Sequence, residues 1–257
     1  MKVTSSDGTS IDVEVTGEGP PVVLVTGGSV DRTANLGLAG ELASDFTVFN
    51  YDRRGRGDST DTLPYAIERE FEDIDAVIGA AGGSAFLYGT SSGGALALHA
   101  TASGLPVTKL TMWEPPFILD PANRPPSDQV ERYEEFTAAG RPGDALEYFM
   151  TKVIGMPQEM VTGMRAQPWW AGQEKHAHTL AYDARIMGDY SLPSDVAEQV
   201  KVPALVVAGG ADMPWMRETA DALAKAIPDG QVRLLEGQGH NVDDAVLAPV
   251  LIEFFNA

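Results

Sequence analysis

A short glycine-rich motif at residues 89–93 constrains the fold of this chain more than any other segment. It reads Gly-Thr-Ser-Ser-Gly and has Ser91 at its centre. The apolar segment 84–88 before it predicts a buried strand, and residues 92–103, rich in Ala and Leu, predict a helix. A serine at such a corner has a strained backbone and an outward-pointing hydroxyl. The two glycines fit there because a Cβ would collide where strand and helix come close.

Two serines stand in this motif, and either could carry its chemistry. The spacing of the glycines favours Ser91 over Ser92 as the exposed residue. The alternative is a structural turn that merely contains a serine. The rest of the chain has to decide between these interpretations.

The remaining chain alternates apolar runs with amphipathic segments. Seven further runs predict strands, at 2–5, 11–16, 22–25, 46–51, 107–112, 204–208 and 231–235. Helical periodicity occupies much of the sequence between them, at 35–43, 65–79, 214–227 and 243–255. This alternation predicts an α/β fold with a mostly parallel eight-stranded sheet, right-handed crossovers and helices on both faces.

The alternation stops in the middle of the chain. Residues 115–194 have helical periodicity, prolines, and many Met and aromatic residues, but no evident strand. We therefore expect residues 1–114 and 195–257 to form the core and 115–194 to form an inserted helical cap. Such a cap would cover the carboxyl edge of the sheet.

The composition excludes several classes of function. A chain of 257 residues with 44% hydrophobic residues can bury a large core. A net charge of −19 argues against binding nucleic acid or an anionic membrane surface. Cysteine is absent, so no disulfide, thiol nucleophile or cysteine zinc site can form. No signal peptide or membrane-spanning run is evident, and we expect a soluble, cytoplasmic protein.

A serine needs a base and an orienting carboxylate to act as a nucleophile. Asp212 follows the run 204–208, and His240 follows the run 231–235. Loops at the carboxyl ends of parallel strands converge on one crevice, so these residues can meet Ser91. The chain order Ser, Asp, His agrees with this arrangement. Glu114, at the end of the run 107–112, is a competing acid that could instead form a salt bridge at the cap junction.

Together these motifs resemble the α/β-hydrolase superfamily over essentially the whole chain. The resemblance rests on the motif around Ser91, the Asp212 and His240 loops, residues 26–28 (Thr-Gly-Gly), and residues 51–59 (Tyr-Asp-Arg-Arg-Gly-Arg-Gly-Asp-Ser). That last stretch is similar to one in the capped serine esterases and the cofactor-free haloperoxidases. Many relatives have histidine where this chain has threonine at the start of the first loop.

The resemblance implies a catalytic role for each of these residues. Ser91 would be the nucleophile, His240 the general base and acid, and Asp212 the orienting carboxylate. The backbone amides of Gly28 and Ser92 would form the oxyanion hole.

The resemblance also implies a reaction class. We expect hydrolysis of an ester, thioester or lactone of a small to medium apolar substrate, without a metal or organic cofactor. Perhydrolysis or C–C bond cleavage could use the same residues. A ligand-binding protein that has lost turnover is the alternative of another class. The sequence leaves open whether the chain forms a homo-oligomer.

Three further features have a structural or a functional interpretation. Of Trp169 and Trp170 in the cap, we expect at least one to line the substrate pocket, and Glu114 is a further pocket candidate. The arginines among residues 53–56 are expected to fix their own loop through Asp52 and Asp58. The histidines at 176 and 178 are not expected to form a metal site, and no complete dinucleotide or Walker pattern exists.

Overall fold

Eight strands form one sheet in the computed structural model, which describes residues 1–211 and 213–257. Their order in the sheet is β1-β2-β4-β3-β5-β6-β7-β8. The strands are β1 (Lys2–Thr4), β2 (Ser10–Thr16), β3 (Pro21–Val25), β4 (Thr47–Tyr51), β5 (Ala85–Thr90), β6 (Val107–Trp113), β7 (Ala204–Gly209) and β8 (Gly230–Leu235). The prediction of an eight-stranded, mostly parallel sheet is confirmed.

The pairing of the strands divides the sheet into two parts. The first two strands form a hairpin, and β2 pairs antiparallel with β4. All pairs from β4 to β8 are parallel. Strands β3 and β7 each have a neighbour on both sides and are buried almost throughout, which explains why their sequences are continuous apolar runs.

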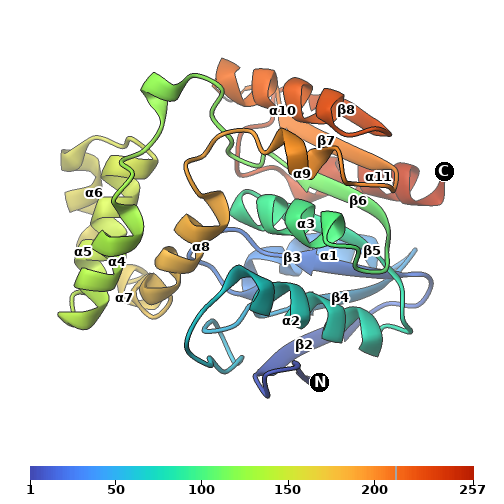
Figure 1. Cartoon of the computed structure of the whole chain (residues 1–257), viewed down its shortest axis with the longest axis horizontal. Coiled ribbons are helices and arrows are strands. Elements are labelled where there is room, and N and C mark those ends of the chain that lie inside the picture. The colour runs from blue at the N-terminus through green and yellow to red at the C-terminus, as the bar shows by residue number, and fades with distance from the viewer. Residues whose placement is uncertain (212) are drawn as a thin grey trace.

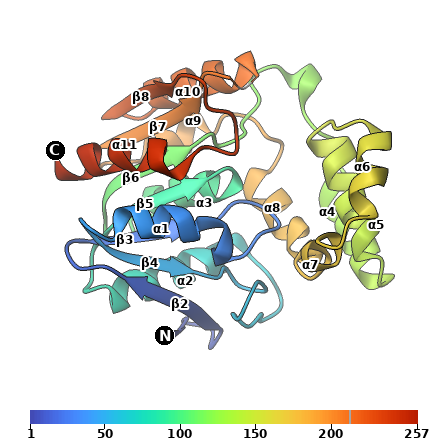
Figure 2. The same ribbon diagram turned by 180° about the vertical axis from the view of Figure 1, so that it is seen from behind.

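Helices cover both faces of this sheet. One face carries α2 (Ile67–Ala80), α3 (Ser92–Ala102), α9 (Ser194–Ala197) and α10 (Pro214–Ala226), and the other carries α1 (Leu36–Leu42) and α11 (Asp244–Asn256). Figure 1 looks onto the first face, and Figure 2 shows the second. Buried aliphatic and aromatic side chains fill the space between each layer and the sheet.

A group of helices is inserted between β6 and β7. It comprises α4 (Gln129–Ala138), α5 (Pro142–Tyr148), α6 (Gln158–Arg165), α7 (Trp170–Glu174) and α8 (Leu180–Met187), with short helical turns η2 (Pro121–Asn123), η3 (Phe149–Val153) and η4 (Ala177–Thr179). A further turn, η1 (Arg32–Asn35), precedes α1 in the core. Residues 114–203 contain no strand.

The inserted helices, which we call the cap, have a hydrophobic core of their own around Tyr133 and Trp170. Figures 1 and 2 show α4 to α7 standing to one side of the sheet, with α8 between them and the core.

The corner between β5 and α3 depends on two glycines. A Cβ on Gly89 would lie 2.3 Å from the carbonyl oxygen of Gly93, and one on Gly93 would lie 2.3 Å from that of Thr26. Only glycine allows backbone segments to approach this closely. The role predicted for these two residues is therefore confirmed.

Candidate active site

Ser91 occupies the corner between β5 and α3 in a strained conformation. Its backbone angles are φ 55° and ψ −127°, outside the regions that a residue with a side chain normally adopts. Such strain costs about 1–3 kcal/mol and persists only where surrounding contacts enforce it. One such contact is the hydrogen bond that the Ser91 N–H donates to the carbonyl of Trp113 on β6, at 2.8 Å.

The loop after β3 packs against Ser91 and its neighbour. A Cβ on Gly27 would lie 3.2 Å from the Cβ of Ser91, and one on Gly28 would lie 3.4 Å from the hydroxyl of Ser92. The backbone of this loop is therefore close to the residue that would form a tetrahedral intermediate. This proximity suits a backbone oxyanion hole, which the sequence predicts from Gly28 and Ser92.

His240 lies in the loop between β8 and α11, and its side chain is hydrogen-bonded to that of Glu114. Its Nδ1 is 2.8 Å from Oε2 of Glu114, and the other carboxylate oxygen accepts a hydrogen bond from the N–H of Gly209 at 2.7 Å. The Glu114 side chain is fully buried, whereas that of His240 is 39% exposed. When the carboxylate is ionised, this bond requires the proton on Nδ1 and leaves Nε2 free to accept one.

Ser91 and His240 line one cavity of about 570 Å³, which we call the main cavity. The backbone segments at Gly28 and Ser92 also reach its wall. Ser91 has no hydrogen bond to His240 in the part of the chain that the structure describes. Such bonds are often long in a site without substrate and tighten when one binds.

The cap and the α10 region make the rest of this wall largely apolar. Phe149, Met187 and Tyr190 contribute from the cap side, and Trp215 and Met216 from α10. None of the described residues that line the main cavity is Lys or Arg. An apolar cavity with a few polar groups at one end is typical of a small-molecule site.

The two tryptophans expected at the pocket lie elsewhere. Trp170 is buried in the cap's own core and donates a hydrogen bond to Glu174, while Trp169 is 45% exposed. Neither is among the residues that line the main cavity, so the structure does not bear out this expectation. Adjacent residues on a helical segment point in different directions, and here the inward one faces the cap core.

The two acids considered in the sequence, Asp212 and Glu114, differ in what the structure says of them. Asp212, the predicted orienting carboxylate, lies outside the described residues. The sequence predicts Glu114 as a pocket residue and as a competing acid. In the structure its carboxylate contacts the imidazole of His240, and Glu114 is not among the described residues that line the main cavity.

Asp183 on α8 is a site residue that the sequence pattern does not reveal. It is buried, lines the main cavity, and accepts a hydrogen bond from the hydroxyl of Ser92 at 3.0 Å. It also accepts hydrogen bonds from Arg53 at 2.9 Å and from Arg56 at 2.8 Å. Burial opposes its ionisation, but the charges of Arg56 and Arg53 outweigh this and lower the pKa of Asp183. The signal available in the sequence is an acidic residue within the largely apolar segment Leu180–Met187.

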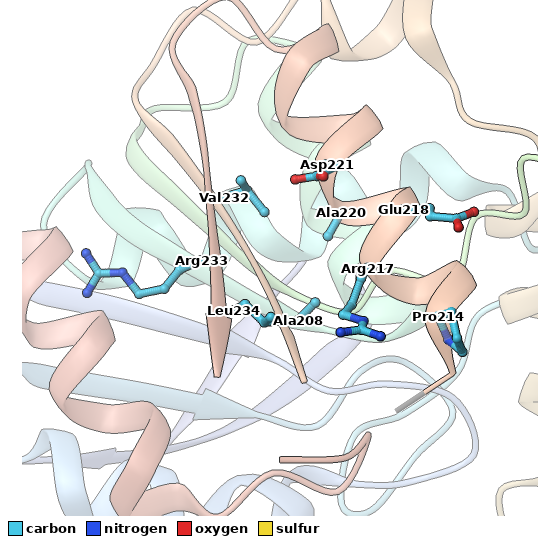
Figure 3. Close-up of a pocket in the computed structure, with 9 residues that line it drawn as sticks. All are labelled: Ala208, Pro214, Arg217, Glu218, Ala220, Asp221, Val232, Arg233 and Leu234. Carbon is cyan, nitrogen blue, oxygen red and sulfur yellow. The ribbon is translucent and has the colours of Figure 1, made fainter. Parts of the chain in front are cut away.

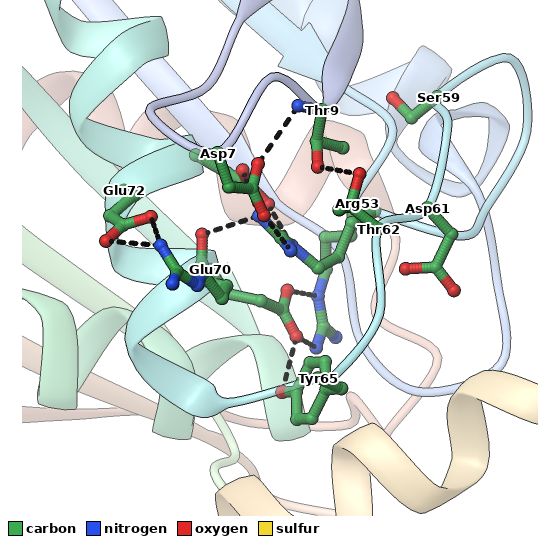
Figure 4. A network of polar contacts seen from close by, with 12 residues as sticks. Asp7, Thr9, Arg53, Ser59, Asp61, Thr62, Tyr65, Glu70 and Glu72 are labelled. Atoms are coloured by element: carbon green, nitrogen blue, oxygen red, sulfur yellow. Dashed lines mark hydrogen bonds and ion pairs between the residues drawn. The ribbon is translucent and has the colours of Figure 1, made fainter.

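The arginines of residues 53–56 are buried, and their partners differ from those expected. Arg53 pairs with Glu70 at 2.7 Å and Arg54 pairs with Asp73 at 2.7 Å. Figure 4 shows Glu70 between Arg53 and the hydroxyl of Tyr65. Glu70 and Asp73 are on α2, so these pairs fix the 51–59 loop to that helix.

Arg32 takes the partners that were expected for those arginines. It contacts Asp12, Asp52 and Asp58, three carboxylates that lie close enough together to hold a metal ion. Its guanidinium already forms ion pairs with all three carboxylates. The cluster is therefore better described as an ion-pair network than as a metal site.

A second cavity, of about 480 Å³, lies outside this site. Figure 3 shows it between α10 and the edge formed by β7 and β8, with Arg217 and Glu218 at its wall. None of the described residues that line it also lines the main cavity. In the described part of the chain, no helix is both long and apolar enough to cross a membrane.

Comparison with known proteins agrees with this fold. The structure is similar to that of an α/β hydrolase from Sphaerobacter thermophilus DSM 20745, with a TM-score of 0.93, 50% identity, and coverage of 99% of this chain and 100% of the other. A thermophilic esterase from Thermogutta terrifontis is 23% identical with a TM-score of 0.73, covering 100% of this chain and 96% of the esterase. At that identity, the likeness concerns the fold alone.

Sequence relatives point the same way. The uncharacterized hydrolase YraK of Bacillus subtilis (strain 168) is 33% identical over 95 residues, which is 35% of this chain and 35% of the relative. The match thus spans about a third of that protein. Residues 22–250 match the family model described as "Alpha/beta hydrolase family". With this match over most of its length, the chain belongs to the alpha/beta hydrolase family.

Proposed function

We propose that this protein is a serine hydrolase that cleaves a carboxylic ester, thioester or lactone through an acyl-enzyme formed on Ser91. One observation carries the proposal. The strained serine at the β5–α3 corner lines the same cavity as His240, and the Nδ1 of that histidine is bonded to a buried carboxylate. This arrangement supplies a nucleophile and a base in the tautomer that can activate it.

The reaction follows from these positions. The Ser91 hydroxyl attacks the substrate carbonyl while Nε2 of His240 takes its proton. The amides of Gly28 and Ser92 stabilise the oxyanion, and such a donor contributes about 3–4 kcal/mol of transition-state stabilisation in other hydrolases. His240 then protonates the leaving alcohol, and water releases the acid in a second cycle.

The main cavity indicates a neutral, largely apolar substrate. Its wall is rich in aromatic and Met side chains, which accommodate an apolar acyl or alcohol group. It offers no described cationic side chain to a substrate carboxylate, and the carboxylates of Asp183 and Asp244 line it. Burying an unpaired anion there would be costly.

Three other functions are compatible with the same framework. Perhydrolysis and C–C cleavage require the same nucleophile and base, and product analysis would distinguish them from ester hydrolysis. A binding protein without turnover would keep the cavity but would not react with an activated acyl or phosphonyl group. Among the contacts of the described residues, none favours any of these three over ester hydrolysis.

A fluorophosphonate probe tests the proposal directly. We expect it to label the wild type and Ser44→Ala, which changes an exposed serine far along the chain from the motif, and to leave Ser91→Ala unlabelled. Hydrolysis of 4-nitrophenyl esters should be lost in the same variant. A wild-type protein that neither reacts with the probe nor hydrolyses these esters would favour binding without catalysis.

A further inference from the structure

We propose that Glu114, at the end of β6, is the carboxylate that holds His240 in its catalytic tautomer. This inference rests on the proposed function. It differs from the expectation drawn from the family resemblance, which assigns that role to Asp212 after β7.

The register of the sheet places Glu114 beside the nucleophile. Thr90 pairs with Trp113 at the ends of β5 and β6, so Ser91 and Glu114 are the residues that directly follow these two neighbouring strands. Trp113 also pairs with Val207 on β7. A side chain leaving β6 at this position can therefore reach a histidine that approaches from the β8 loop.

Several contacts hold the Glu114 side chain in this position. Its N–H donates to the carbonyl of Val207 at 3.0 Å, and its carboxylate accepts the N–H of Gly209 at 2.7 Å. Its φ is 43°, a conformation that a residue with a side chain adopts only under constraint. A Cβ on Gly209 would lie 2.2 Å from the carbonyl of Gln238 and 3.2 Å from the Glu114 carboxylate. Glycine at this position thus leaves room for the carboxylate beside β7.

The preceding residue, Trp113, connects the same two catalytic candidates. Its carbonyl accepts the Ser91 N–H at 2.8 Å, and its indole N–H donates to the backbone carbonyl of His240 at 2.9 Å. Two consecutive residues at the end of β6 therefore contact Ser91, the backbone of His240 and the imidazole of His240. This convergence indicates that the end of β6 positions both the nucleophile and the base.

The burial of Glu114 gives its contact with His240 a chemical consequence. A fully buried carboxylate is stable only with hydrogen-bond donors, and its donors here are the Gly209 amide and Nδ1 of His240. Because Nδ1–H donates its hydrogen bond to the Glu114 carboxylate, Nε2 is the basic nitrogen of the neutral imidazole. When His240 becomes positively charged in the transition state, the carboxylate stabilises that charge without taking the proton.

The test compares Glu114→Gln with Asp212→Asn. Glutamine has the same shape as glutamate but can present its amide N–H₂ to Nδ1, which favours the wrong tautomer. We expect Glu114→Gln to lower kcat by roughly 10³–10⁴-fold with a much smaller change in KM, as in a serine protease with the corresponding change. Asp212→Asn should lose at least tenfold less. Glu68→Gln, a matched change at an exposed glutamate on α2, should retain wild-type kcat.

Nuclear magnetic resonance tests the pairing without turnover. In ¹⁵N-histidine protein at neutral pH, we expect the proton of His240 on Nδ1, with a downfield resonance that is absent in His240→Asn and Glu114→Gln. A proton on Nε2 instead, or a resonance lost in Asp212→Asn and retained in Glu114→Gln, would overturn the proposal. If the wild type hydrolyses no ester but keeps this resonance, the proposed function fails while the pairing stands. If Glu114→Gln does not fold, the wild-type and Asp212→Asn spectra still decide.

Discussion

The cap residue Asp183 accepts a hydrogen bond from Ser92, the residue directly after the candidate nucleophile, at 3.0 Å. The same carboxylate pairs with Arg53 and Arg56, whose guanidinium groups also bind the carbonyls of Thr26 and Gly27 in the loop after β3. One cap side chain is thereby joined to both backbone segments of the candidate oxyanion hole.

Replacing Asp183 by Asn should therefore destabilise the protein strongly. The change removes the carboxylate charge that pairs with buried Arg56 and leaves buried Arg53 with Glu70 as its remaining carboxylate partner. Breaking a buried pair in this way costs about 3–5 kcal/mol. Urea unfolding gives the free-energy difference. Asp189→Asn, which alters a largely exposed carboxylate close by in the chain, should have only a small effect. Hydrogen exchange of α8 and of residues 26–30 should rise together in Asp183→Asn, and an unchanged stability would contradict the proposed linkage.

Two Gly→Ala changes should have opposite effects. In Gly93→Ala the new Cβ would lie 2.3 Å from the Thr26 carbonyl, so the backbone has to move, and we expect a loss of at least about 2–3 kcal/mol and of esterase activity. Gly79 lies in α2 and has open space around it. Gly79→Ala should stabilise the protein by about 0.5–1 kcal/mol, because Ala favours a helix more than Gly does. Denaturation curves of both variants measure these effects, and equal effects would contradict the steric explanation.

Stability should decrease as the pH falls below about 6.5, the ordinary value for histidine. Burial lowers the pKa of His99 in α3, and burial is also the main cause of the lowered pKa values of His176 and His178. The folded state thus favours the neutral imidazole, and the unfolded state binds more protons in this range. The stabilisation is complete above the unfolded pKa and is lost as the pH falls toward the folded one.

His99→Gln isolates the contribution of one of these residues, since glutamine does not titrate. We expect the difference in free energy of unfolding between pH 7.5 and pH 5.5 to be smaller in this variant than in the wild type. Urea titrations at both pH values measure it. The same difference in both proteins would show that His99 makes no contribution.

A negative charge on the substrate should lower turnover strongly. We expect kcat/KM for 4-nitrophenyl butyrate to exceed that for the 4-nitrophenyl ester of succinic acid by at least about 10²-fold, because the main cavity offers the free carboxylate no described cation. Burial and the nearby Asp243 and Glu41 raise the pKa of Asp244, which indicates that this wall already disfavours negative charge. Equal rates for the two esters would contradict this account.

Much of the fold could be predicted from local patterns. The apolar runs, the glycines at the β5–α3 corner and the position of Ser91 depend on short segments, and the structure confirms the strands and the corner. The site depends on contacts between distant residues. Glu114 and His240 are 126 positions apart, and which acid reaches the imidazole is decided by strand register and side-chain length.

The packing of the cap helices could not be predicted from the sequence, for a related reason. Helical periodicity identifies its helices but does not say which face each one presents to its neighbours. For this reason Trp170 could not be assigned to the cap core, nor Asp183 to the cavity, before the helices were placed.

The ion pairs of Asp183 also limit how a ligand can enter and leave the main cavity. Lifting the cap as a rigid lid would separate Asp183 from Arg53 and Arg56 and would disturb the loop that contacts Ser91. We therefore expect substrate to enter and product to leave through an opening at the side of the main cavity while the cap stays in place. Ile154 lines the main cavity and is 49% exposed, which places this opening beside it. The size of the side chain at position 154 should therefore affect the rates of substrate entry and product release more than the rate of the chemical step.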